Sequence, residues 1–239
     1  MLPGIYSAAN GMDAAQRQQE IIARNLAHAQ MPGFRRLVPY FDSNGDDVSA
    51  SDFAGSKSNN QAIDFTPGGL MQTGAPLDFA ISGDGFFTIE GPNGPLFTRN
   101  GVFQISPEGQ LVTTDGLPVA AEQGVITFPQ NADLSKLAVG QDGRLSLNNI
   151  PLGKLKLVSV ANPQNFELVG ATLMALPDGD SVLPMEGTLL QGVREQSNVH
   201  PVQELVTMIA AMRQHEAAQR SMTALSRAVE RHQDLSGGQ

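Results

Sequence analysis

The chain has 239 residues, with 15 basic and 24 acidic side chains, a net charge of −9 and no cysteine. The absence of cysteine excludes disulfides and cysteine-ligated metal sites. The first 40 residues carry a net charge of +2 and residues 201–239 are neutral, which leaves −11 for the middle. An acidic middle disfavours binding to a phosphate backbone, so no nucleic-acid partner is expected.

No run of residues approaches the roughly 18 consecutive apolar positions that a membrane-spanning helix needs. The first residues, Met1-Leu2-Pro3-Gly4-Ile5-Tyr6-Ser7, contain neither a basic segment nor a continuous apolar run. We therefore expect no membrane span and no cleaved secretory signal, so any export would use another route.

The first 30 residues have the periodicity of a helix. Apolar residues recur at alternating spacings of three and four, with Gln19 as the single polar position: Ile5, Ala8, Met12, Ala15, Ile22, Leu26 and Ala29. The row is narrow and extends over more than three heptads, which is typical of a coiled-coil seam. Pro32-Gly33 would stop the helix. The pattern predicts an N-terminal coiled-coil helix within residues 1–36.

The next segment has no such period. Between Asp42 and Gly69 the chain is rich in Ser, Asn, Asp and Gly, and its apolar residues occur only singly. Such a composition cannot build a core of its own. Residues 37–76 are predicted to form a polar linker or extended arm.

Residues 77–196 alternate between short apolar runs and turn sequences. Asn-Gly and Asp-Gly pairs supply the positive φ angles that tight hairpins require, and the turns are expected at residues 91–94, 100–101, 106–109, 115–116 and 142–143. Lys154-Leu155-Lys156-Leu157 alternates as a half-buried strand should. Because no helical period separates the strands, the segment predicts a compact antiparallel β domain.

The last segment, residues 197–239, is helical again. Ser197 or Asn198 could cap the helix, Pro201 suits its first turn, and Glu204 favours the positive end of the dipole. Two apolar rows follow, separated by a ten-residue step: Val202, Leu205, Ile209 and Met212, then Met222, Leu225 and Val229. The pattern predicts a second long coiled-coil helix from about Pro201 to Asp234, roughly 50 Å long.

The predicted fold class is therefore α+β, a compact antiparallel β domain flanked by N- and C-terminal long coiled-coil helices that pack together. Helices with such narrow seams are marginal alone, because most helical stability comes from packing an apolar face. Two interpretations stay open. Either the helices pack on each other and then on helices of neighbouring subunits, or they form a self-contained two-helix stalk within a monomer.

The sequence lacks the patterns of a catalytic, metal or cofactor site. The four histidines, at 28, 200, 215 and 232, include no pair four residues apart that could ligate a metal from one helical face. Asp42, Asn44 and Asp46 suggest a calcium loop, but Phe53 stands where a bidentate Glu is needed. We expect no enzyme, no metal and no cofactor.

Three blocks of sequence resemble one known family. Residues 25–34, NLAHAQMPGF, resemble the N-terminal motif of bacterial flagellar axial proteins, which form the rod and the hook. Residues 77–87, LDFAISGDGFF, resemble the family's central motif, and residues 97–101 and 109–113 continue it. Ser197-Asn198-Val199, with Glu204, Val206, Met208 and Ile209, is similar to its C-terminal motif. The blocks lie in family order and reach both ends of the chain.

The resemblance implies a structural subunit of the flagellar basal-body rod that polymerises helically through its terminal helices to build the drive shaft for motility. Its partners would be itself, other rod and hook proteins and the flagellar type III export apparatus, with peptidoglycan and ring proteins as further candidates. It would lie in the periplasmic part of the basal body, and no signal peptide would be cleaved during its export. The seam residues of both helices, from Ile5 to Ala29 and from Val202 to Val229, would form the assembly interface.

Length and local motifs refine the resemblance. A chain of 239 residues fits a rod protein better than a hook protein, which is usually much longer. Pro201 after Ser197-Asn198-Val199-His200, together with residues 153–158, favours the proximal rod over the distal rod. His28, Gln30, Met31, His215 and Ala218 depart from the family's usual residues.

The alternative is a different class of function, a β-rich binding module with coiled-coil anchors, which would be carbohydrate-binding or tail-fibre-like. A glycan hydrolase is a third candidate.

Overall fold

The computed structural model describes residues 2–40, 61–177, 181–185 and 187–236. The chain divides into two compact units. The helical unit comprises Met1–Ala27, Leu37–Asp64 and Val199–Gln239, and the β unit comprises His28–Arg36 and Phe65–Asn198. Each unit thus combines segments that are far apart in the sequence.

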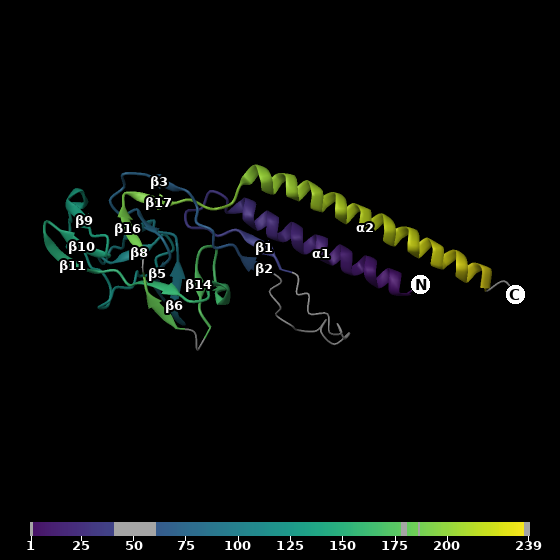
Figure 1. Ribbon diagram of the computed structural model, residues 1–239, viewed down its shortest axis with the longest axis horizontal. Helices are drawn as coiled ribbons and strands as arrows, with labels where there is room; N and C mark the ends of the chain where they lie inside the picture. Colours follow the sequence, from purple (N-terminus) through teal and green to yellow (C-terminus); the bar gives the residue numbers. More distant parts are fainter. Residues whose placement is uncertain (1, 41–60, 178–180, 186, 237–239) are drawn as a thin grey trace. The chain divides into compact units, whose positions relative to one another are not determined.

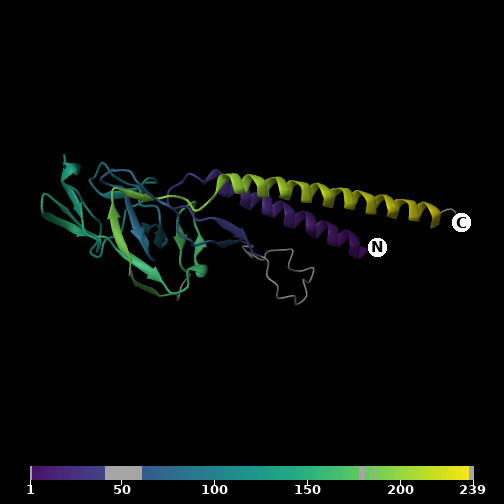
Figure 2. The same ribbon diagram turned by 45° about the horizontal axis from the view of Figure 1, so that its top comes forward.

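The helical unit contains two helices, α1 (Leu2–Ala27) and α2 (Pro201–Ser236). They lie side by side in both views, with the two chain termini at the same end, so the helices are antiparallel (Figures 1 and 2). At 1.5 Å per residue, their 26 and 36 residues correspond to about 39 and 54 Å. The prediction that the two terminal helices pack together is confirmed.

A short ribbon of two strands completes the described part of the helical unit. Strand β1 (Leu37–Pro39) pairs with β2 (Gln61–Ile63), and Leu37 lies opposite Ile63. Both strands fall within the segment predicted as a polar arm. Residues 41–60, including the calcium-loop pattern considered at Asp42–Phe53, lie outside the described residues.

The β unit is built from antiparallel strand pairs. Its largest sheet has six strands in the order β13-β14-β6-β5-β12-β15, a second has the order β11-β10-β9, and three pairs, β16-β4, β17-β3 and β7-β8, complete it. The strands are β3 (Leu70–Gln72), β4 (Phe79–Ser82), β5 (Phe86–Gly91), β6 (Gly94–Thr98), β7 (Phe103–Ile105), β8 (Leu111–Thr113), β9 (Leu137–Val139), β10 (Arg144–Leu147), β11 (Ile150–Lys154), β12 (Leu157–Val160), β13 (Glu167–Leu168), β14 (Met174–Ala175), β15 (Val182–Pro184), β16 (Thr188–Gln191) and β17 (Val193–Glu195). Two single-turn 3₁₀ helices, Leu134–Lys136 and Pro163–Asn165, lie between strands. The predicted α+β class with an antiparallel β domain is confirmed.

Phenylalanines and branched aliphatic residues form the core of the β unit. Phe79, Phe87 and Ile89 are fully buried, and the Phe87 and Phe103 rings meet edge to face with centroids 5.2 Å apart. Edge-to-face contact suits the quadrupoles of aromatic rings. Leu145, from the separate β9–β10–β11 sheet, belongs to the same buried cluster. One core therefore joins the sheets of this unit.

Most of the predicted turns connect paired strands as expected. Gly91 lies opposite Gly94 at the end of the β5–β6 hairpin, residues 106–109 join β7 to β8, and residues 142–143 join β9 to β10. Gly143 has φ +87°, a left-handed conformation that favours glycine.

The prediction of a tight hairpin at Asn100-Gly101 is wrong. The strands on either side, β6 and β7, pair with β5 and β8 instead of with each other. The Asn100 Oδ1 accepts a hydrogen bond from the Val102 N–H at 3.1 Å, so the side chain closes a local turn. Gly101 passes so close to Phe79 that a Cβ atom would lie 1.9 Å from its carbonyl oxygen. Glycine is required here for a close crossing of two backbone segments.

The single strand predicted at residues 154–157 is also wrong. The burial alternation is present, with Leu155 buried and Lys156 exposed, but β11 ends at Lys154 and β12 begins at Leu157. At the junction the Lys156 N–H donates to the Ala120 carbonyl oxygen at 3.0 Å. The segment that contains Ala120 thus accepts a hydrogen bond that a continuous strand would donate to a neighbouring strand.

Candidate assembly surface

The predicted seam of α1 is the face that packs inside the helical unit. Ala15 and Ile22 are buried, and Met12 and Leu26 are half-buried, on a helix whose partner in the unit is α2. The side chains of Ile5 and Ala8 lie outside the described residues, and Ala29 follows the end of the helix.

The buried face of α2 excludes the predicted seam residues from Val202 to Met212 and includes one residue of the predicted seam, Met222. Glu204 and Ala211 are each only 1% exposed. Half-buried residues at helical spacing continue this face along the helix: Thr207, Met208, His215, Ala218 and Met222. The face that packs in the unit therefore combines small, polar and flexible side chains.

The first apolar row of the predicted seam of α2, Val202, Leu205, Ile209 and Met212, is exposed, and so is Val206, which was not part of the predicted seam. We call the following five side chains the apolar row, and their exposed fractions are 77% for Val202, 48% for Leu205, 64% for Val206, 53% for Ile209 and 51% for Met212. Scattered surface apolar residues are common, but a contiguous row at helical spacing indicates an interaction site. Leu225 and Val229, which the sequence adds to the seam, have side chains outside the described part of the structure.

A buried polar contact joins the two helices and β1. Asn25 is fully buried, its Nδ2 donates to the Leu37 carbonyl oxygen at 2.8 Å, and its Oδ1 accepts from the Leu37 N–H at 2.8 Å. The same Nδ2 also donates to Oε2 of the buried Glu204 at 3.5 Å. Sequence reasoning assigned Glu204 to the helix dipole and to the C-terminal motif but not to a buried contact, because periodicity does not show which polar residue faces inward.

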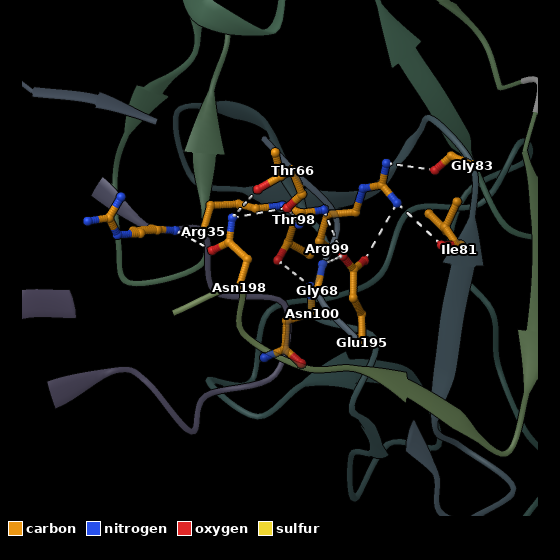
Figure 3. Close-up of polar contacts among 11 residues, drawn as sticks. Arg35, Thr66, Gly68, Ile81, Gly83, Thr98, Arg99, Asn100, Glu195 and Asn198 are labelled. Atoms are coloured by element: carbon orange, nitrogen blue, oxygen red, sulfur yellow. Dashed lines mark hydrogen bonds and ion pairs between the residues drawn. The ribbon is translucent and has the colours of Figure 1, made fainter. Parts of the chain in front are cut away.

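Glu195 lies at the centre of a second buried polar cluster, within the β unit (Figure 3). Its Oε1 pairs with Arg35 Nη2 at 2.8 Å and its Oε2 with Arg99 Nη1 at 3.6 Å, and the Gly68 N–H donates to Oε1 at 3.0 Å. Arg35, Arg99 and Glu195 are 4%, 6% and 1% exposed. The carboxylate thus holds two guanidinium groups that are removed from water.

The environment of Arg99 explains how a buried cation is tolerated. Its guanidinium donates to the carbonyl oxygens of Ile81 and Gly83 at 3.3 and 2.9 Å and lies 5.1 Å from the centroid of the Phe86 ring. Burial lowers the pKa of Arg99 to about 10, and the negative charge of Glu195 opposes this decrease. Arg99 is therefore charged at neutral pH.

Asn198 has a role that the sequence did not predict. It was a candidate cap for α2, but the first helical hydrogen bond runs from the Glu204 N–H to the His200 carbonyl oxygen, so the helix starts beyond it. The Asn198 Oδ1 accepts from the Arg36 N–H at 2.7 Å, and its Nδ2 donates to the Thr66 carbonyl oxygen at 3.0 Å. Asn198 thus ties together the two segments that Arg35 and Glu195 also join.

Neither polar cluster resembles a reaction centre. Among the described residues, no group of three or more His, Asp or Glu side chains is arranged to hold a metal ion. The same described part contains no helix that is both long and apolar enough to cross a bilayer. The features that remain to be explained are the apolar row and the buried polar contacts.

Comparison with known proteins identifies the family. Residues 80–147 match the flagellar hook protein FlgE/F/G D1 domain, and residues 190–228 match the flagellar basal body rod FlgEFG protein C-terminal region. The chain is 31% identical to flagellar basal-body rod protein FlgG of Buchnera aphidicola over 97% of its own length and 98% of the relative. It is 33% identical to rod protein FlgF of Salmonella typhimurium, covering 92% and 93% of the two chains. The chain belongs to the flagellar basal-body rod protein family.

Membership of the rod protein family confirms the resemblance found in the sequence and makes the chain a structural rod subunit. The match at residues 80–147 runs from β4 to β10 of the β unit. The match at residues 190–228 includes Glu195, Glu204 and the whole apolar row. The exposed row is thus part of the region that this chain shares with other rod proteins.

Proposed function

We propose that this rod subunit polymerises helically through its terminal helices and that the apolar row on α2 is a contact with neighbouring subunits. The observation that supports this proposal most strongly is the exposure of all five side chains of the row on a helix that already packs on α1 by another face. An exposed apolar face of this kind promotes aggregation of a lone subunit, whereas in an assembly it is buried against a neighbouring subunit.

The size of the row fits a repeated contact of moderate strength. Burying a half-exposed aliphatic side chain contributes about 1 kcal/mol, so the five together would contribute roughly 5 kcal/mol before the cost of association. A single contact of this size is weak. A subunit inside a polymer makes the contact twice, once through its own apolar row and once through the surface that receives the row of a neighbour. The free energies of many such weak contacts then add.

Helical assembly requires contacts that do not close on themselves. The apolar row of one subunit would pack on a different surface of the next, which is the heterologous arrangement that generates filaments. Close-packed interiors are poorly compressible, so interlocking helices would resist shear while the shaft transmits torque. The coiled-coil character predicted for residues 1–36 and 197–239 would then arise between subunits.

The parts of the chain would divide the work of assembly. Residues 1–36 and 197–239 would form the coiled-coil assembly helices, residues 77–196 the surrounding β domain, and residues 37–76 an arm between them. The buried Arg35–Glu195–Arg99 cluster supports this division, because it fixes the chain segment after α1 and the segment before α2 to one β unit. The protein would act in the periplasmic basal body without enzymatic activity, after export by the flagellar type III apparatus. Peptidoglycan and ring proteins are further candidate contacts.

Immunogold labelling of purified hook–basal bodies tests the proposed location. An antibody to residues 70–190 should label the shaft between the membrane rings. Label close to the inner ring would support the proximal position that the sequence favours, and label further out would support the distal one. Absence of label on intact, antibody-accessible shafts would contradict the proposal.

The stalk interpretation makes a different prediction about the apolar row. If the helices served only as a stalk within a monomer, charged substitutions in the row would leave incorporation into the rod unchanged. The binding-module alternative is not favoured, because both matched regions belong to rod and hook proteins.

A further inference from the structure

The three-stranded sheet of β9, β10 and β11 ends in a tight hairpin. The sheet lies at one end of the β unit (Figure 1). Leu147 pairs with Ile150, so the loop between β10 and β11 consists of Asn148 and Asn149, whose φ angles are +52° and +66°. Two left-handed residues in succession form a type I′ turn, whose twist matches that of the paired strands. We call residues 148–151 the hairpin tip, and its backbone is tightly constrained.

The hairpin tip presents an apolar side chain to solvent. Ile150 is 65% exposed, and Pro151 beside it is also exposed. Residues 147–153, Leu-Asn-Asn-Ile-Pro-Leu-Gly, carry no charge. A single exposed aliphatic residue is common on protein surfaces. One that a rigid turn holds in place, however, loses little conformational freedom when it binds, which favours binding.

A groove lies at the opposite end of the same sheet. Its walls come from the β9–β10 turn, the junction between β11 and β12, and strand β15, and its volume is about 640 Å³. Leu157 and Met185 line it, together with Val182 and Leu183 of β15, which are 41% and 46% exposed. Pockets of this volume hold ligands the size of several side chains. We call this hollow the β15 groove.

The charges around the β15 groove are balanced. Its charged lining residues are Glu122, Asp142, Lys154 and Lys156. Lys154 Nζ pairs with Glu122 at 2.7 Å, and Asp142 pairs with the nearby Arg144 at 3.0 Å. A charged ligand would lose water here without gaining an excess of opposite charge. The groove therefore suits an uncharged apolar ligand, and the hairpin tip has this chemistry.

The hairpin tip and the β15 groove cannot serve each other within one molecule. Asp142, in the groove wall, precedes β10, and the tip follows the end of β10 at Leu147. The two features are thus held apart by the length of a paired strand. Complementary features at opposite ends of one sheet produce a head-to-tail contact, which continues from copy to copy and generates helical polymers.

The position of both features in the sequence favours a second copy as the partner. The two family matches cover residues 80–147 and 190–228, whereas the hairpin tip and β15 lie between them. A contact made by residues outside the matched regions favours a partner that carries the same residues. A second copy of this chain meets that condition.

We propose that the hairpin tip of one subunit inserts Ile150 into the β15 groove of a second copy in the rod. The inference rests on the proposed polymerisation and adds a contact between β units to the contact made by the apolar row. It depends on the β unit alone. Ile150 fills the groove, and Val182 and Leu183 of the second copy lose their exposure to water.

Crosslinking in the assembled rod tests this contact, and the chain contains no cysteine that would interfere. Full-length Ile150→Cys and Leu183→Cys are expressed together as the only copies, and purified hook–basal bodies are treated with a short bismaleimide. Each molecule has one thiol, so a bond between positions 150 and 183 must join two copies. We expect the subunit to shift to the mass of a dimer.

Val169→Cys provides the matched control. Val169 is 60% exposed and follows β13, at the opposite edge of the six-stranded sheet from β15. Expressed together with Ile150→Cys, it should leave the subunit at the mass of a monomer. Ile150→Cys alone should also give the monomer, because a head-to-tail contact does not bring two tips together.

Charged substitutions give a second measurement that does not require the cysteine variants to enter the rod. Ile150→Asp and Val169→Asp both change exposed residues, so both proteins should keep the wild-type Tm. Only Ile150→Asp would bury an unpaired charge in the rod. It should be lost from purified hook–basal bodies, whereas Val169→Asp and the conservative Ile150→Leu should be retained.

Three results would overturn the proposal. The first is a dimer yield for positions 150 and 183 no higher than for 150 and 169 in rods that contain both variants. The second is dimer formation by Ile150→Cys alone, and the third is incorporation of Ile150→Asp at the wild-type level. Absence of the wild-type chain from the shaft would refute the proposed function, whereas subunits that are present but not crosslinked refute only this contact.

Discussion

Removal of the Glu195 carboxylate should damage the β unit severely. Glu195→Ala leaves the guanidinium groups of Arg35 and Arg99 without their shared counter-charge at positions that are 4% and 6% exposed. Breaking a buried ion pair by deleting one partner costs about 3–5 kcal/mol, and the Gly68 N–H that loses its acceptor adds about 1 kcal/mol or more. We expect the free energy of unfolding to fall by about 5 kcal/mol, which is a large share of the 5–15 kcal/mol typical of proteins.

Thermal and urea unfolding followed by circular dichroism measure this loss, which corresponds to a decrease in Tm of about 10–20 °C. Glu122→Ala is the matched control. Its carboxylate accepts from Lys154 Nζ at 2.7 Å, as short as the Arg35 contact, but both side chains are at least one-third exposed, so the loss should stay below about 1 kcal/mol. Glu195→Gln keeps an acceptor for Gly68 and should lie between the two. If Glu195→Ala costs no more than Glu122→Ala, burial does not strengthen the cluster and the reasoning is refuted.

Three other predictions follow from buried contacts. Asn25→Asp removes a hydrogen-bond donor and places a second carboxylate beside Glu204. Thermal unfolding followed by the helical signal should therefore show a free energy of unfolding lower by about 2–4 kcal/mol. An unchanged unfolding curve would exclude the contact. Gly101→Ala would place a Cβ 1.9 Å from the Phe79 carbonyl oxygen, so the urea midpoint of the β unit should fall, and an unchanged midpoint would contradict the close crossing. Burial lowers the pKa of Arg99 to about 10 in the folded chain, and in the unfolded chain this pKa has its higher ordinary value, so the unfolded state binds more protons than the folded state only above about pH 10. The difference in free energy of unfolding between wild type and Arg99→Met should therefore be constant from pH 6 to 9. Above pH 10 the free energy of unfolding of the wild type should rise relative to that of the variant. A difference that changes with pH between 6 and 9 would contradict this.

The helices and most hairpins were predictable because their signals are local. Helix α2 was expected from about Pro201 to Asp234 and extends from Pro201 to Ser236, since periodicity and capping depend on neighbouring residues. The Asn100-Gly101 turn was misassigned because an Asn-Gly pair specifies a reversal of the backbone and not the strand that pairs after it. That choice depends on Phe79, which lies 22 positions before Gly101 and receives its close approach.

The seam of α2 was found in the sequence, but its partner was not. Periodicity identified Val202, Leu205, Ile209 and Met212 as one face, and apolarity implied that this face is buried. The structure leaves it exposed and packs α2 by Glu204 and Ala211. Sequence reasoning also missed the Arg35–Glu195–Arg99 cluster, because a charged residue carries no local sign that it will be buried with a partner 160 positions away.

The central claim, that the apolar row of α2 is a subunit contact, is tested most directly by substituting Ile209. Ile209→Asp places a charge in the middle of the row at a position that is 53% exposed in the subunit, so the isolated protein should keep its wild-type Tm. Expressed as the only copy, it should be missing from purified hook–basal bodies and leave the cells non-motile, because assembly would bury an unpaired charge. Incorporation at the wild-type level, with normal motility, would contradict the assignment of the row to assembly.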